Sequence, residues 1–141
     1  MPYVARQDLI DRFGEQEILQ LTDKVDPPAG AIDDTVLGRA IADADGVIDA
    51  HLVGRYALPL ASVPKILVRY ACDLTRYFLW EDSASEPVMR AYKAAMAFLE
   101  AIAKGTASLG LDAANQPVAT DGGSVSFNES RRVFGGDREF G

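Results

Sequence analysis

The sequence is poor in the residues from which catalytic and metal sites are usually built. Its 141 residues include one histidine, one cysteine and one tryptophan. A single cysteine cannot form an intrachain disulfide or a cysteine-rich zinc site, and no serine–histidine–aspartate set can be argued around the single histidine. The phosphate-binding patterns GxxxxGK[ST] and GxGxxG are absent too. Because no reaction is selected, we expect a protein that is not an enzyme and that holds no metal or cofactor.

Long hydrophobic runs and a basic surplus are also missing. No stretch of 18 apolar residues occurs, so no membrane-spanning helix is expected. The first residues lack the basic-then-apolar pattern of a secretory signal, which favours an intracellular site of synthesis. The chain carries 14 Lys and Arg against 21 Asp and Glu, a net charge of −7. Since phosphate neutralisation supplies most of the affinity of nucleic-acid binders, DNA binding is expected only from a local patch.

The acidic surplus lies in the first two-fifths of the chain. Residues 1–58 carry 5 basic and 11 acidic side chains, residues 59–104 carry 6 and 5, and residues 105–141 carry 3 and 5. One hypothesis for this asymmetry is a small regulatory module that binds a basic partner protein through its acidic N-terminal half. A measurement of particle size would distinguish such a module, which should stay small, from a protein that forms a large oligomer.

Hydrophobic spacing predicts an all-α fold for the first 105 residues. Apolar residues recur every three or four positions, which is the period of an amphipathic helix. We expect a bundle of three long helices preceded by a short N-terminal helical hairpin. The pattern predicts two short helices within residues 6–23 that break at Gly14, a long helix from the N-cap Asp33 to about Leu58, a second that Pro64 opens, and a third from Ser85-Glu86-Pro87 to Lys104-Gly105.

The residues that follow differ in composition. The segment from 105 to 141 holds 7 of the 12 glycines and no helical periodicity, with a brief strand possible at 124–127. We therefore divide the chain into a helical bundle domain, residues 1–105, and an extended C-terminal arm, residues 106–141. Arginines and aromatic residues anchor interfaces, so the arm is expected to order on a neighbouring subunit, the alternative being a flexible, weakly adhesive terminus. The candidate interface residues are Phe127, Arg131, Arg132, Val133, Phe134, Arg138 and Phe140.

Four residues within the helices deserve separate hypotheses. We expect His51 to be a packed or half-buried histidine rather than a metal ligand or a catalytic residue. Cys72 lies in an apolar stripe, so we expect it to behave as a small hydrophobic residue. Asp45 and Asp49 stand one helical turn apart and favour a solvated acidic edge over a cation site. A small enzyme using Asp45, Asp49 or His51 is the least supported interpretation.

Two further positions have both a structural and an interface interpretation. In the segment Arg55-Tyr56-Ala57-Leu58-Pro59-Leu60, the apolar side chains would fill the gap between two helices, or the corner would contact another protein. Trp80 would close the end of the bundle, or it would lie in an interface, where tryptophan is enriched. Arg55, Tyr56 and Trp80 are therefore candidate interface residues.

Four stretches of the chain match the sequence pattern of a known protein family. The more specific pieces are Arg55–Leu60 and the turn Ala103-Lys104-Gly105. Together the stretches span roughly residues 3–112, and the arm matches only loosely, in ending with Arg-Val-Phe and a few further residues. The stretches are Asp8–Glu15 with Gln20–Asp23, Ala40–Ala44 with Ile48–Leu52 and Arg55–Leu60, Val63–Tyr77, and Tyr92–Leu99 with Ile102–Gly105 and Leu109–Asp112. In these stretches the chain resembles the Mu-like prophage neck proteins assigned to head–tail joining.

The resemblance implies an all-helical adaptor without catalysis. Such a protein forms a homo-oligomeric ring of about twelvefold symmetry beneath the portal protein, and it meets a tail-side neck or tail-terminator protein. It would be made in the host cytoplasm and end in the neck of the virion, with no membrane partner. DNA would pass through the ring unbound, and an acidic lumen meets that need. Asp43, Asp45 and Asp49 are the candidate lumen acids. In related connectors the C-terminal segment reaches other neck components.

Overall fold

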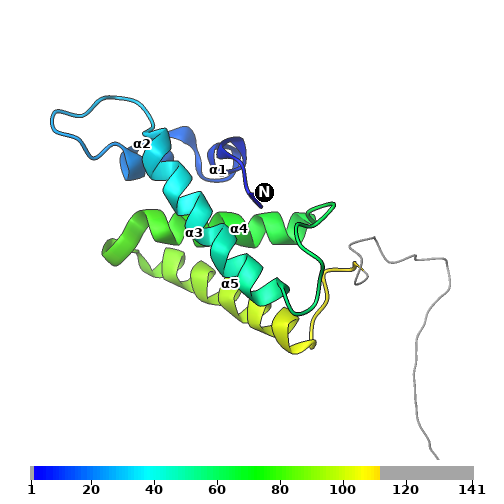
Figure 1. Ribbon diagram of the computed structural model, residues 1–141. Coiled ribbons are helices and arrows are strands. Elements are labelled where there is room, and N and C mark those ends of the chain that lie inside the picture. Colours follow the sequence, from blue (N-terminus) through cyan, green and yellow to red (C-terminus); the bar gives the residue numbers. More distant parts are fainter. Residues whose placement is uncertain (1, 112–141) are drawn as a thin grey trace, which may run out of the picture.

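The structure, a computed structural model, describes residues 2–111, and these form a purely helical body. The predicted all-α class is confirmed for this part of the chain, which contains no strand. Three long helices, α3, α4 and α5, pack against one another, and a short helical pair lies at one side (Figure 1). The elements are α1 Arg6–Phe13, α2 Glu15–Thr22, α3 Asp34–Leu52, α4 Lys65–Trp80, the 3-10 turn η1 Glu81–Ser83 and α5 Glu86–Lys104.

The hydrophobic core lies where the three long helices meet. Each contributes one apolar face, as the spacing of their hydrophobic residues predicts. Aromatic rings continue the seam between α4 and α5, where Tyr77 stacks on Tyr92 with ring centres 3.8 Å apart and Tyr70 stacks on Phe98 at 4.7 Å. The buried residues of the long helices include Leu37, Ala40, Ala44, Ile48 and Leu52 of α3, Leu67, Ala71, Cys72, Leu74 and Leu79 of α4, and Ala95, Leu99 and Ile102 of α5.

The N-terminal helices pack against α4 through an ion pair. Gly14 separates α1 from α2 with a φ of 94°, a conformation that glycine adopts readily. Arg76 of α4 donates to both carboxylate oxygens of Glu17 in α2, from Nε at 2.7 Å and from Nη2 at 3.0 Å. Its guanidinium also lies over the ring of Phe13, 4.5 Å from the ring centre. The guanidinium of Arg76 therefore faces the N-terminal hairpin.

Helix α3 begins where the sequence predicts and ends earlier. The Asp33 carboxylate accepts the N–H groups of Thr35 and Val36, at 2.9 and 3.3 Å, which confirms the N-cap. The prediction that the helix reaches Leu58 is wrong, since α3 ends at Leu52. The N–H groups of Arg55 and Tyr56 both return to the carbonyl of Leu52, and this tight turn leads the chain away from the helix axis.

Helix α5 has the predicted limits, and the chain folds back after it. It starts after Ser85, whose hydroxyl makes no capping hydrogen bond, and it ends at the left-handed Gly105, with a φ of 84°. Residues 106–111 then return along the body, where Leu109 and Leu111 are buried in the core. The described body thus extends into the first six residues of the segment that we assigned to the arm.

None of the helices in residues 2–111 is both long and apolar enough to cross a bilayer.

Candidate functional site

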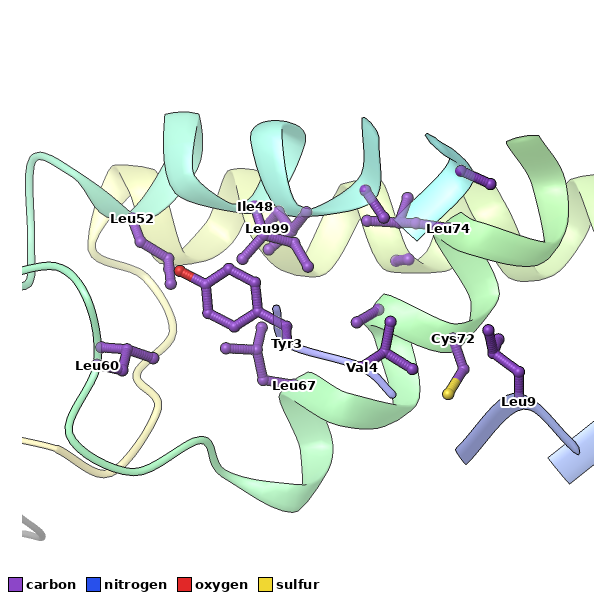
Figure 2. Close-up of a cluster of buried hydrophobic side chains, with 14 of the residues drawn as sticks. Tyr3, Val4, Leu9, Ile48, Leu52, Leu60, Leu67, Cys72, Leu74 and Leu99 are labelled. Carbon is purple, nitrogen blue, oxygen red and sulfur yellow. The ribbon is translucent and has the colours of Figure 1, made fainter. Parts of the chain in front are cut away.

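The acidic side of α3 is occupied by the N-terminal segment of the chain. Tyr3 is only 5% exposed, and its ring lies among Ile48, Leu52, Leu60 and Leu67 (Figure 2). Its backbone N–H donates to Asp45 Oδ1 at 2.9 Å, and its phenol donates to Asp49 Oδ1. Two of the three candidate lumen acids therefore hold the N-terminal segment in place, a role that was not predicted from the sequence.

This arrangement changes the protonation chemistry of the groups involved. Burial raises the pKa of the Asp45 carboxyl, the hydrogen bond from the Tyr3 amide lowers it, and the neighbouring Asp49 raises it again, so the net direction is upward. Burial and the hydrogen bond to Asp49 raise the pKa of the Tyr3 phenol. The phenol therefore remains a protonated donor at neutral pH.

The three candidate lumen acids do not share one face of α3. Successive helix residues are about 100° apart, so Asp45 and Asp49 lie roughly 40° from each other while Asp43 lies roughly 160° from Asp45. Asp43 is exposed and lines a separate hollow of about 270 Å³ with Arg39 and Phe78, among others. Only one of these two sides can face any single lumen.

The histidine and the cysteine both have structural surroundings. His51 is half-buried, and its Nδ1 lies 2.8 Å from the carbonyl oxygen of Val47, one turn back in α3. Burial raises the pKa of the Cys72 thiol to about 11, so the thiolate needed for nucleophilic attack is scarce at neutral pH. Within residues 2–111, no three His, Cys, Asp or Glu side chains come together as a metal site.

Arg55 and Tyr56 connect the turn after α3 to the end of α5. The Arg55 Nε donates to the carbonyl of Ala103 at 3.4 Å, so a cation stands at the negative end of the helix dipole. The Tyr56 hydroxyl accepts the N–H of Leu109 at 3.1 Å. Leu60 is buried beside them, as the structural interpretation of this segment expects. Whether the corner also contacts another protein stays a prediction.

Trp80 ends α4 with an unsatisfied donor. The residue as a whole is half-buried. Its indole Nε1 is fully buried and has no hydrogen-bond acceptor among the described residues. Beside it, Lys24 and Glu81 form an exposed ion pair that lowers the pKa of the Glu81 carboxyl. A buried indole N–H normally finds a partner, so an interface role for Trp80 stays a prediction.

The seven candidate interface residues of the arm, from Phe127 to Phe140, lie outside the described residues. Within the body, the burial of Tyr3 and the pairing of Glu17 with Arg76 were not predicted from the sequence. The ion pair joins residues that are 59 positions apart in the sequence, and no local sequence pattern predicts a contact between residues so far apart. Tyr3 lies outside any segment with helical periodicity, so its aromatic side chain is the only sequence feature that could have predicted its burial.

Comparison with known proteins places the chain in a phage family. A family profile described as "Bacteriophage Mu, Gp36" matches residues 3–127. The chain belongs to this family. Among Mu Gp36 relatives, it is 35% identical over 123 residues to the "Mu-like prophage FluMu protein gp36" of Haemophilus influenzae, covering 87% of this chain and 86% of the relative. It is 31% identical over 112 residues to "Gene product J" of Escherichia phage Mu, with 79% of each protein covered.

Proposed function

We propose that this protein is a structural head–tail connector in the neck of a tailed phage. In this role copies of the chain form a ring between the portal and the tail, and DNA passes through the lumen without specific binding. The protein is made and assembled in the host cytoplasm and remains in the virion. No bond-making step is part of the proposal.

The observation that carries the proposal is a phage-family helical body with an acidic surface. Residues 2–111 carry 11 Lys and Arg against 16 Asp and Glu, and the candidate lumen acid Asp43 is exposed on α3. Such a wall repels phosphate rather than binding it, which suits a passage for DNA. The match of the family profile across residues 3–127 supports the phage origin on which the proposal rests.

Assembly would be coupled to ordering of the C-terminal arm. A segment that orders only on its partner loses conformational entropy at that step, so joining depends on a correctly placed template. Arginine and phenylalanine side chains of residues 127–140 would supply the contacts.

The proposal is tested by mixing the purified full-length chain with the portal protein of the same phage. We expect negative-stain micrographs to show a closed ring of added density on the tail-facing side of the portal. A chain that stays small in light scattering and leaves the portal bare would contradict the proposal, and would favour the regulatory module.

A second test uses the phage itself. A virion preparation from a phage with a stop codon early in this gene should contain DNA-filled heads and separate, complete tails. Supplying the intact gene from a plasmid should restore joined particles. Joined, infectious particles in the absence of the protein would contradict a connector role.

A further inference from the structure

A pocket beside the N-terminal segment has the chemistry of a site for a basic side chain. It encloses about 300 Å³ and is lined by Tyr3, Asp49, Leu58, Pro59, Leu60 and Val63. Apolar walls of this kind suit the aliphatic stem of an arginine, while a carboxylate suits its guanidinium. The pocket thus combines two features that a long cationic side chain requires.

The carboxylate in this pocket has an unused acceptor. Asp49 takes the Tyr3 phenol on Oδ1, and its Oδ2 has no hydrogen-bond partner among residues 2–111. Tyr3 fixes the position of the carboxylate, so a guanidinium would meet an acceptor that is already oriented. A hydrogen bond to a charged group in a partly desolvated pocket is stronger than a bond between neutral groups.

The segment after α5 is hydrogen-bonded to the loop that leads into this pocket. The Tyr56 hydroxyl holds the backbone at Leu109, and the segment after α5 runs beside the loop that contains Leu58 and Val63 (Figure 1). Thirty residues follow Leu111, and they include adjacent arginines at 131 and 132. Arg131 is 20 residues beyond Leu111, a reach of up to roughly 70 Å when extended. A 19-residue helix such as α3 spans only about 28 Å, so the segment can reach well beyond its own body.

We infer that this pocket receives the Arg131-Arg132 segment of a second copy of the chain. One guanidinium pairs with Asp49, and its stem lies against Leu58 and Pro59. The inference rests on the proposed ring, because a ring places each C-terminal segment beside the body of a neighbour. It adds a defined receptor site to that proposal.

A disulfide trapping experiment between full-length chains tests the inference. One chain carries Ser62→Cys at the rim of the pocket, and the other carries Gly135→Cys, three residues after Arg132. The natural Cys72 can stay, since its thiol is buried. Mixed under mild oxidation, the two variants should give a cross-linked heterodimer on a non-reducing gel. Replacing Ser62→Cys by Ser83→Cys, at the other end of α4, should reduce the heterodimer at least five-fold.

One substitution in the pocket and a matched control outside it sharpen the test. Asp49→Asn, introduced into the Ser62→Cys chain, should lower the rate of cross-linking at least five-fold. Asp43→Asn neutralises a carboxylate on a different side of α3, outside this pocket, so it should leave the rate within two-fold. Equal rates for Asp49→Asn and the parent chain would overturn the inference. So would a predominantly intramolecular product in a chain that carries both cysteines.

Light scattering on the same mixtures, with portal present, separates failure of this inference from failure of the proposed function. Rings that form without pocket-dependent cross-links would overturn the pocket assignment alone. Absence of any ring would contradict the connector role.

Discussion

At the scale of single residues, the Glu17–Arg76 pair is the main polar contact between the N-terminal hairpin and the long helices. Both side chains are about one-quarter exposed, and two hydrogen bonds join them. An ion pair in this setting is screened less than one on the open surface, and its bidentate geometry fixes the orientation of α2 against α4. The pair therefore determines the orientation of the hairpin on α4 and also stabilises its packing there.

Replacement of Glu17 by alanine should lower the free energy of unfolding by about 1–3 kcal/mol, because Arg76 is left half-buried without its carboxylate. Urea denaturation followed by circular dichroism measures this change. The matched control is Glu86→Ala, which also removes a first-turn glutamate but breaks an exposed pair with Arg90 at 3.8 Å. That substitution should cost less than about 1 kcal/mol. Equal losses would show that the docking role of Glu17 is wrong.

The raised pKa of Asp45 predicts a specific dependence of stability on pH. Because its folded pKa lies above the ordinary value, the folded state retains the proton longer than the unfolded chain. Stability from this group is therefore greatest below the ordinary aspartate pKa of about 3.9 and falls as the pH rises through the folded pKa. Asp45→Asn should remove that fall, and its amide oxygen can still accept the Tyr3 N–H.

Urea denaturation at a series of pH values between 3 and 8 measures the effect. The difference in unfolding free energy between Asp45→Asn and the parent chain should shift in favour of the variant as the pH rises. Asp43→Asn, at an exposed position without a hydrogen-bond partner in the described residues, should change the free energy by less than about 0.5 kcal/mol. A difference that is constant across this range would contradict the assignment.

At the scale of the elements, α3 contains two glycines that its own fold does not require. A Cβ built at Gly38 or Gly46 meets no atom within 4 Å. Glycine inside a helix costs about 1 kcal/mol relative to alanine, so each glycine-to-alanine change should raise the unfolding free energy by about 0.5–1 kcal/mol. Thermal melting measures the gain.

Gly105 provides the opposite case for the same substitution. Its φ is 84°, and an added Cβ would lie 2.1 Å from Arg55 Nη2. Gly105→Ala should therefore lower the unfolding free energy by about 1 kcal/mol or more. A stabilised Gly105→Ala variant, or a destabilised Gly38→Ala variant, would show that these helix environments are described wrongly.

The helices were predictable because their evidence is local. Asp33 and Gly105 mark helix ends through residues within one turn of them, and the spacing of apolar residues directly predicts which face of each helix is buried. The early end of α3 was harder to foresee, because no proline follows Leu52 before Pro59 and the chain turns through hydrogen bonds to a single carbonyl. The burial of Tyr3 depends on a hollow formed by three separate elements, and no spacing within the sequence encodes that hollow.

At the scale of the whole molecule, the body does not stop at the end of α5. Leu109 and Leu111 are 7% and 8% exposed, so the segment after the last helix completes the core. A division of the chain for experiments should therefore follow Leu111. The division at residue 105 suggested by composition would remove buried leucines.

A chain that ends at Leu111 should unfold cooperatively, with a free energy within about 1 kcal/mol of the full-length protein, and should fail to assemble on the portal. A chain that ends at Lys104 should have a free energy of unfolding lower by about 3–5 kcal/mol, because it lacks the two leucines, Leu109 and Leu111, that are buried on folding. Urea denaturation and pelleting with portal measure the two effects. Truncation at Leu111 that still joins heads to tails would contradict the role of the arm.

The hydrogen bond from Leu109 to Tyr56 also has a geometric consequence for any closed assembly of this chain. It fixes the origin of the last 30 residues at one point on each body. In a circle of identical bodies these origins repeat at equal angles and at one height. Every C-terminal segment would then start from an equivalent position, so the arrangement of the helical bodies would fix the spacing between these starting points.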